Sequence, residues 1–255
     1  MLELYHGLAS TCSKKVRMCL AEKGLEWESH LLQLQKFEQF DPDYLKLNPN
    51  GVVPTLVHNG RVVTESTVII EYLDDAFPEV PLKPIDPFPR AQMRMWEKWS
   101  DDVGYAAVYI PTWDKLSRPV AEKLDDEELE KVLERVPTAE RRARWRLVAR
   151  GSFSEEEFAS AYEKMERTFA RMEATLAEGP WLAGDGFSLG DIAMIPFIDR
   201  MLDLRADLVG FERYPVVYDW YKRVQERPSF RAAFFFQNMD ASTGAVSQAL
   251  ASGTA

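Results

Sequence analysis

Residues 50–66 read Asn-Gly-Val-Val-Pro-Thr-Leu-Val-His-Asn-Gly-Arg-Val-Val-Thr-Glu-Ser and contain the clearest local structural signals of the chain. Two short apolar runs flank Asn59-Gly60, a dipeptide that tolerates positive φ at both central positions of a tight turn. The pattern therefore predicts a β-hairpin over residues 55–57 and 61–63. Pro54 cannot donate to a strand ladder, so we expect it at the first residue of the hairpin.

The residues on either side of this hairpin predict a binding site. A cis bond before Pro54 would turn the main chain of Val53 outward, where it can pair with a ligand. Glu65 and Ser66 open an apolar-periodic run, which predicts a helix over residues 65–76 with an anion-binding N-terminus. Together these features suit a small peptide that carries a free carboxylate.

The segments before the hairpin complete an α/β unit. They predict strands at residues 2–5 and 25–32, helices at residues 13–23 and 41–47, and a helix C-cap at Gly24. The order is β-α-β-α-β-β-α, which we assign to an N-terminal domain over residues 1–78.

Composition changes after residue 76. Five prolines between residues 77 and 89 cannot continue a helix, so residues 79–89 are predicted to be a linker. Every later segment has helical periodicity, which predicts an all-helical domain over residues 90–238 and a flexible tail at residues 239–255. The predicted helices span residues 90–113, 125–136, 140–150, 155–176, 188 onward, 214–226 and about 228–236. Ser188 and Asp191 form a predicted capping box, and residues 192–197 should be the centre of the core.

The net charge and composition of the chain argue against several classes of partner. The chain has 255 residues, a net charge of −10 and a pI of about 5.0, which argues against nucleic acid and anionic membranes. No apolar run approaches the ~20 residues of a membrane helix, and no secretory leader is visible. Cys12 and Cys19 are too far apart along a helix to bridge, so we expect reduced thiols and a cytoplasmic location. The three histidines stand singly and no metal-ligand spacing occurs, so no metal site is predicted.

The most reactive stretch is Ser-Thr-Cys-Ser-Lys-Lys-Val-Arg at residues 10–17, where the first strand turns into the first helix. The helix N-terminus directs amides and a positive half-charge at one point, which would stabilise a thiolate of Cys12 or of a ligand. We expect Lys14, Lys15 and Arg17 to add positive potential there.

Taken together, the ordered motifs make the chain resemble the cytosolic glutathione transferases over roughly residues 1–235. The motifs are residues 10–17, Leu47-Asn48-Pro49, Val53-Pro54-Thr55-Leu56, Glu65-Ser66, Ile70-Glu71-Tyr72-Leu73 and Ser188-Leu189-Gly190-Asp191-Ile192-Ala193. The resemblance implies a thioredoxin-like N-terminal domain, an all-helical C-terminal domain, glutathione as co-substrate and a homodimer. It also implies a cis Pro54, Val53 pairing with the cysteinyl part of glutathione, and Glu65 and Ser66 holding its γ-glutamyl end.

The resemblance offers three candidates for the catalytic residue. Ser10 matches the hydroxyl of serine-type members such as the zeta class, Cys12 the cysteine of a reductive dehalogenase, and Ser13 a serine of the bacterial lignin β-etherases. A charged insertion near residues 117–154 favours the β-etherase and dehalogenase side. Many members grip the glycine carboxylate with a histidine and a lysine where this chain has Gln39 and Phe40. Gln39 can still donate a hydrogen bond, and Lys36 is a possible substitute.

Simpler interpretations stand beside these. Cys12 can be a packing residue, Ser10 or Ser13 a helix cap, and Glu65-Ser66 a cap of the third helix. Cys19 is expected in the core. Tyr105, Tyr109 and Trp113 share a helix face that is either core or the wall of the second-substrate pocket. The arginines at residues 141–146 are expected on the solvated surface, paired with acidic residues 125–130.

The reaction implied is attack of the glutathione thiolate on a hydrophobic electrophile, with loss of a phenol, halide or similar group. This covers β-aryl ether cleavage, dehalogenation and conjugation, as used in aromatic degradation or detoxification. Two alternatives remain: a glutathione-dependent thiol oxidoreductase that uses Cys12, and a non-catalytic binding module of the same fold.

Overall fold

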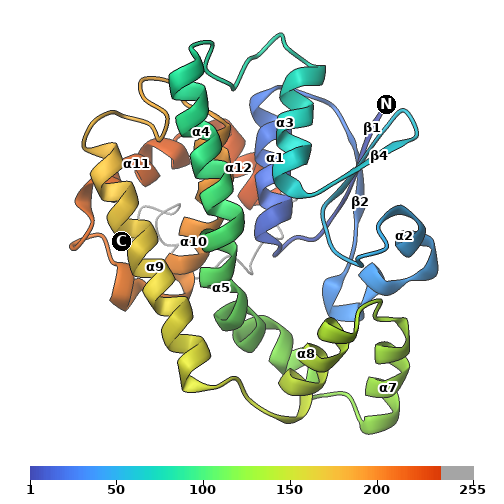
Figure 1. Ribbon diagram of the computed structural model, residues 1–255. Helices are drawn as coiled ribbons and strands as arrows, with labels where there is room; N and C mark the ends of the chain where they lie inside the picture. The colour runs from blue at the N-terminus through green and yellow to red at the C-terminus, as the bar shows by residue number, and fades with distance from the viewer. Residues whose placement is uncertain (237–255) are drawn as a thin grey trace.

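The N-terminal domain contains a four-stranded mixed sheet with the strand order β2-β1-β3-β4 (Figure 1). The computed structural model describes residues 1–236, so the predicted tail at residues 239–255 lies outside the described part. The strands are β1 (Leu2–His6), β2 (Glu28–Leu31), β3 (Thr55–His58) and β4 (Arg61–Thr64). β1 runs parallel to β2 and antiparallel to β3. The predicted hairpin is confirmed, with φ values of 52° at Asn59 and 78° at Gly60.

Three helices and two short 3₁₀ turns complete this domain. They are α1 (Thr11–Glu22), η1 (Leu34–Lys36), η2 (Glu38–Phe40), α2 (Pro42–Leu47) and α3 (Ser66–Ala76). In Figure 1, α1 and α3 lie between the sheet and the C-terminal helices, and α2 lies on the other side. The predicted thioredoxin-like order is therefore confirmed. α1 begins two residues earlier than predicted, because Ser10 rather than Ser13 is its N-cap.

Strand register brings four connecting segments to one edge of the sheet. Tyr5 pairs with Thr55, and Thr55 pairs with Thr64. The end of β1, the start of β3 and the end of β4 therefore lie side by side. The end of β2 joins them, because Leu31 pairs with His6. All the segments that carry the predicted glutathione contacts start or finish at this edge.

The second domain is helical, and its first helix begins earlier than predicted. The helices are α4 (Pro87–Trp99), α5 (Tyr105–Thr112), α6 (Arg118–Ala121), α7 (Asp126–Arg135), α8 (Ala139–Arg150), α9 (Glu155–Leu176), α10 (Leu189–Val209), α11 (Pro215–Gln225) and α12 (Pro228–Phe234). The Asp86 carboxylate accepts a hydrogen bond from the Phe88 amide at 2.7 Å, and Pro87 occupies the first helical position. Proline is tolerated there because that amide needs no partner, so the linker ends at Asp86 and not at residue 89.

Helical backbone continues through residues 87–121 instead of stopping at residue 113. It widens to a π-helix at η3 (Ser100–Gly104) and again at η4 (Trp113–Ser117). These widened turns flank α5 and turn its side chains relative to those of α4; such π segments often accompany functional sites.

The predicted centre of the C-terminal core is confirmed. Side chains of α10 are buried without interruption over residues 189–202. The Asp191 carboxylate accepts from the Ser188 amide at 3.0 Å and from the Trp220 indole at 2.8 Å. Burial raises the pKa of Asp191 to about 6. No helix in the described part of the chain has both the length and the apolar character needed to cross a bilayer.

Candidate active site

The β1–α1 loop ends at Ser10, whose hydroxyl caps α1. The Ser10 Oγ accepts a hydrogen bond from the Ser13 amide at 3.2 Å. A hydroxyl has two lone pairs and one proton, so capping occupies one lone pair and leaves the O–H able to donate. Ser10 is partly exposed at the edge described above. Capping and stabilisation of a bound thiolate are therefore compatible in this residue.

The other two catalytic candidates lie in different surroundings. Ser13 is fully buried, and its Oγ accepts from the Gly7 amide at 3.2 Å, behind the start of the helix. Cys12 is partly exposed and unbridged. Cys19 belongs to the core, as predicted, and burial raises its pKa above the usual thiol range.

Two buried arginines hold the loop by its carbonyl groups. Arg17 of α1 donates to the carbonyls of Gly7 and Leu8, both at 3.1 Å. Arg200 of α10 donates to the next carbonyl, that of Ala9, at 2.9 Å. The loop backbone immediately before Ser10 is thus fixed from both domains. No sequence signal points to the Arg200 contact, because the two residues are 191 positions apart.

His6, which precedes the loop, is held neutral. Burial and then the Arg17 charge lower the pKa of His6 to about 3. Its Nδ1 accepts from Arg17 at 3.1 Å, so the proton resides on Nε2, which lies 2.8 Å from the Ser29 hydroxyl. The ring anchors the arginine that grips the loop.

The lysines after Ser13 do not project positive potential into the site, which corrects that expectation. Lys14 is buried and lies 3.5 Å from Asp199. Lys15 is also buried and donates to Thr67 at 2.9 Å and to Asp101 at 3.2 Å. Packing by α3, α10 and α12 against α1 encloses both side chains, and carboxylates balance their charge.

The Val53–Pro54 peptide bond is cis, as the resemblance implied. Neither the amide nor the carbonyl of Val53 has a hydrogen-bond partner within residues 1–236. The turn before it is fixed by α2: the Asn48 side chain donates to the Val52 carbonyl at 2.9 Å and to Thr55 at 3.1 Å. The Val53 main chain is therefore in place and available for a peptide ligand.

Glu65 has an unusual conformation for a residue with a side chain. Its φ is 68° and ψ is 112°, in a region that L-residues rarely adopt and that clusters at functional sites. Glu65, and not Ser66, is the N-cap of α3, and its carboxylate has no partner in the described structure. Ser66 is the first helical residue, so its amide points out of the helix end. Next to it, Thr67 donates to Asp101 at 2.8 Å.

Gln39 and Phe40 differ in their surroundings. The Gln39 side chain is 7% exposed and its Oε1 is buried without a partner among the described residues. Phe40 packs in an apolar cluster and touches Gly51, where any Cβ would lie 2.8 Å from the ring. Phe40 is thus a packing residue, while Gln39 has unused hydrogen-bonding capacity. Lys36 is exposed.

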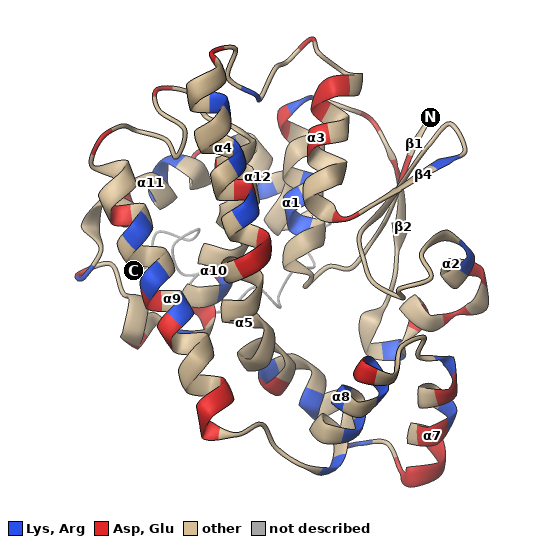
Figure 2. Cartoon of the chain, viewed as in Figure 1, with Lys and Arg blue, Asp and Glu red and all other residues tan. Residues whose placement is uncertain are grey.

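The charged insertion forms a small core of its own that includes this loop. Phe37 contacts Trp145 of α8 with ring centroids 4.9 Å apart, and Arg135 of α7 pairs with Asp41 at 2.8 Å. Basic residues on α8 face acidic ones on α7, as in the Arg146–Glu130 pair at 2.8 Å (Figure 2). The insertion therefore braces the loop that carries Gln39.

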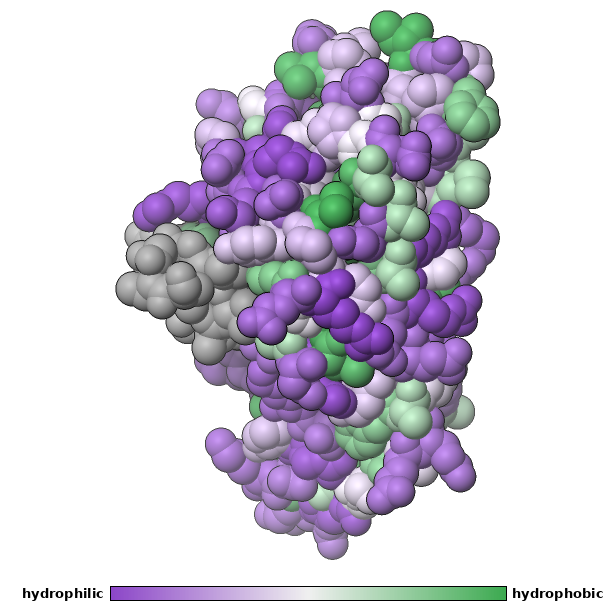
Figure 3. Space-filling model, turned by 90° about the vertical axis from the view of Figure 1, so that its left-hand side faces the viewer, coloured by the Kyte–Doolittle hydropathy of each residue, from purple (hydrophilic) through white to green (hydrophobic). Residues whose placement is uncertain are grey.

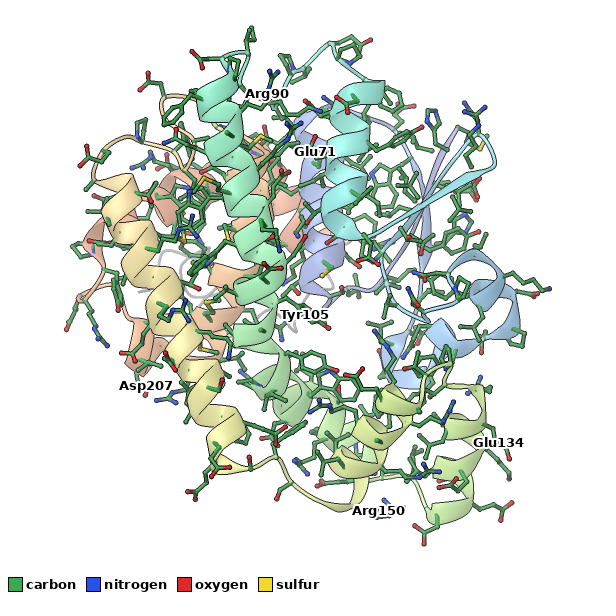
Figure 4. The ribbon with its side chains drawn as sticks, in the orientation of Figure 1. Glu71, Arg90, Tyr105, Glu134, Arg150 and Asp207 are labelled. Atoms are coloured by element: carbon green, nitrogen blue, oxygen red, sulfur yellow. The ribbon has the colours of Figure 1, made fainter. Side chains whose placement is uncertain are left out.

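An aromatic row leads from this core toward the β1–α1 loop. Tyr105 and Tyr109 have ring centroids 5.2 Å apart, and Tyr109 and Trp113 5.7 Å. Tyr109 and Trp113 pack partly into the insertion core, whereas Tyr105 is 40% exposed at the start of α5 (Figure 4). Burial raises the pKa of Tyr105, and the nearby Cys12 acts in the same direction. Tyr105 therefore lies within electrostatic reach of the loop.

Arg144 departs from the expected solvated cluster. Its guanidinium lies 5.3 Å from the centroid of Tyr109 and 5.4 Å from that of Phe153. It also lies 3.4 Å from Glu157, with only 20% of the side chain exposed. Arg146 is on the solvated surface and paired with an acidic residue, as expected. Arg144 lies between the rings of Tyr109 and Phe153, because the face of α8 that carries it packs toward α5.

One group of possible metal ligands has no counterpart in the sequence prediction. Glu3, Glu28 and His30 each place a ligand-type atom within 4.8 Å of the others. They lie on neighbouring strands, which sequence spacing cannot reveal. The His30 Nε2 is 3.2 Å from Glu3 and 3.5 Å from Glu28, so the three groups satisfy one another.

Comparison with known proteins agrees with this geometry. The glutathione S-transferase N-terminal domain matches residues 9–76, and the C-terminal domain matches residues 115–228. Protein LigF of Sphingobium sp. strain SYK-6 is 39% identical over 239 residues, covering 91% of this chain and 93% of LigF. Glutathione S-transferase Z1 of Arabidopsis thaliana is 30% identical, covering 96% of each chain. The crystal structure of beta-etherase LigF superposes with a TM-score of 0.86 at 38% identity, covering 91% of this chain and 98% of that one. This chain therefore belongs to the glutathione S-transferase family.

Proposed function

We propose that this transferase activates glutathione for attack on a hydrophobic aryl ether, releasing a phenol. The observation that carries the proposal is the Ser10 hydroxyl, which retains a donor at a loop fixed by Arg17 and Arg200. The α1 N-terminus adds a positive half-charge at the same point. The similarity to LigF, whose crystal structure is described as that of a beta-etherase, favours ether cleavage over dehalogenation and conjugation.

Glutathione would lie along the sheet edge. Its cysteinyl part would pair with the Val53 main chain, and its γ-glutamyl carboxylate would bind the Ser66 amide, with the Glu65 carboxylate receiving the ammonium group. Gln39 would meet the glycine end. Tyr105 and Tyr109 would line the second-substrate pocket. Ser13 is fully buried, so we assign the thiolate contact to Ser10.

Calorimetry with glutathione and turnover of a β-aryl ether test this assignment. We expect Ser10→Ala to lower kcat about 10- to 100-fold with a small change in glutathione affinity, because the hydroxyl acts on the sulfur. Cys12→Ala should retain most of the ether cleavage. Absence of binding heat at millimolar glutathione would refute the transferase assignment, and full activity of Ser10→Ala would remove the role of Ser10.

Cys12 supports a second activity, thiol–disulfide exchange with glutathione, because it is the one partly exposed thiol at the start of α1 in the described structure. Loss of exchange in Cys12→Ser with ether cleavage retained would establish both activities.

We further propose a homodimer, in keeping with a cytoplasmic enzyme. Val68 of α3 is 54% exposed, and Phe88 and Met95 of α4 are 72% and 57% exposed. Met95 borders a groove of about 630 Å³ that runs between α4 and Arg171 of α9. By contrast, the side drawn in Figure 3 is mostly hydrophilic, with apolar side chains in small separate groups. A second copy would cover these exposed apolar side chains of α3 and α4 together with the groove beside Met95, which Arg90, Arg94 and Lys98 also line.

A further inference from the structure

Arg141, in the first turn of α8, differs from the other arginines of that helix. Arg142 donates to the Val136 carbonyl at 2.7 Å, Arg144 pairs with Glu157, and Arg146 pairs with Glu130. The Arg141 guanidinium has no hydrogen bond or ion pair within residues 1–236, although the residue is only partly exposed. A partly exposed guanidinium with no protein partner among the described residues is available for an anionic ligand.

The position of Arg141 directs that charge at the aromatic row. Arg141 precedes Arg144 by three residues, so both project from one face of α8, the face that meets α5 at Tyr109. The two arginines lower the pKa of the Tyr105 hydroxyl, against the dominant effect of burial, and so act electrostatically at the exposed end of the row. Cys12 also acts electrostatically on the Tyr105 hydroxyl, so this end of the row is within range of both the arginines and the β1–α1 loop.

We propose that Arg141 binds the oxygen of the departing phenolate while the leaving ring packs against Tyr105 and Tyr109. This inference rests on the proposed ether cleavage and adds the group that receives the negative charge. Arg144 serves differently, because it is wedged between Tyr109 and Phe153 and paired with Glu157, and so holds the aromatic wall in position.

The step balances without an oxidant or reductant. The glutathione sulfur forms a bond to the ether carbon as the carbon–oxygen bond breaks, and the bonding pair stays on oxygen. The products are a glutathione thioether and a phenolate. A guanidinium beside that oxygen stabilises charge that is absent from the neutral ether, so it favours the transition state over bound substrate.

The substrate class follows from this assignment. Phenols with electron-withdrawing substituents leave readily without help, whereas weakly acidic phenols need a counter-charge. We therefore expect the wild-type protein to cleave ethers of weakly acidic phenols, and this capacity to depend on Arg141.

The test compares Arg141→Gln with Arg146→Gln, a matched control on the same helix whose side chain is exposed and paired with Glu130. kcat/KM is measured for aryl ethers whose leaving phenols differ in acidity. We expect Arg141→Gln to lower kcat/KM about 10- to 100-fold for ethers of the least acidic phenols. For nitrophenyl ethers the decrease should be less than about threefold. Arg146→Gln should match the wild type, and glutathione binding should be unchanged in both. A loss of equal size across the series, or no loss, would overturn the proposal.

Equilibrium binding separates this proposal from the proposed function. Binding of 4-nitrophenolate and of neutral 4-nitroanisole is measured for the wild type and both variants in the presence of glutathione. We expect only Arg141→Gln to weaken the binding of 4-nitrophenolate. Neither variant should weaken the binding of 4-nitroanisole. If the wild type cleaves no ether, the proposed function fails, and the phenolate measurement still decides the role of Arg141.

Discussion

At the scale of single residues, Ser10 shows how one hydroxyl can serve both structure and chemistry. Its oxygen accepts the hydrogen bond that starts α1, and this cap fixes the direction in which its proton can be donated. Loss of a serine N-cap costs about 1 kcal/mol, so a less stable Ser10→Ala protein is expected as well as a slower one. Ser10→Gly removes the hydroxyl at a capping cost of only about a few tenths of a kcal/mol, so comparing it with Ser10→Ala separates the two effects.

Glu97 of α4 is a buried carboxyl without a role in the proposed mechanism. The side chain is 3% exposed and its Oε1 has no partner among the described residues. Burial, and then the charge of Glu71 on α3 (Figure 4), raise the pKa of Glu97 from 4.5 to about 8. The native state therefore retains a proton that the unfolded chain releases, and stability falls as pH rises from about 4.5 to about 8.

Glu97→Gln should remove this pH dependence because the amide does not ionise. We expect the free energy of unfolding at pH 8.5 to rise by roughly 1–3 kcal/mol relative to the wild type, with a much smaller difference at pH 5. Urea denaturation from pH 5 to 9 measures it, with Glu134→Gln on the exposed face of α7 as control (Figure 4). An unchanged slope in Glu97→Gln would contradict the assignment.

At the scale of elements, the insertion packs against the loop that carries Gln39. Phe37 lies between η1 and η2 and packs in the core formed by α7 and α8. Gln39 lies two residues later. The insertion thus supports the loop whose Gln39 is proposed to meet the glycine end of glutathione. Its folding and the order of that loop should be coupled.

Trp145→Ala tests this coupling. Removing the indole takes away the nearer of the two rings that pack on Phe37, so the loop should be less ordered and the Kd for glutathione should rise about three- to tenfold. Stability should fall by about 3–5 kcal/mol. The control is Trp181→Ala, which removes an indole packed against Phe187 at 5.0 Å in another part of the domain. Equal glutathione affinity in the two variants would show that the insertion is independent of the site.

Local signals explain what can be predicted from the sequence. The Asn59-Gly60 turn, the Ser188–Asp191 capping box and the apolar run of α10 each depend on residues within a few positions, and the sequence predicts all three. The predicted linker is three residues too long because Pro87 and Pro89 suit a helix start as well as a loop. The Arg200–Ala9 contact cannot be predicted, because no rule of spacing connects residues on different domains.

The same limit applies to charge. Lys14 and Lys15 are ordinary surface residue types, and their burial depends on how three other helices pack on α1. Arg144 cannot be distinguished from Arg146 on composition, since the difference is which face of α8 meets α5. Side-chain identity predicts the candidate site residues, but their electrostatic environment requires the fold.

At the scale of the whole molecule, self-association is the expectation to test. Met95→Glu places a charge on the apolar face of α4, and burying it against a second copy would be unfavourable. We expect light scattering to show a dimer for the wild type and a monomer for the variant. Lys131→Glu, an exposed charge change on α7, should leave the dimer intact. A wild-type monomer at micromolar concentration would refute the homodimer.

The grip of Arg17 and Arg200 on three successive carbonyls has a consequence for recombination between relatives. The loop that presents Ser10 receives two hydrogen bonds from an arginine of its own half and one from an arginine of the other half. A chimaera that joins the first 86 residues to the helical half of a relative can fold and still hold the Ser10 hydroxyl in the wrong orientation. The helical half can be exchanged without loss of function only where the new half also has an arginine at the position of Arg200 on α10.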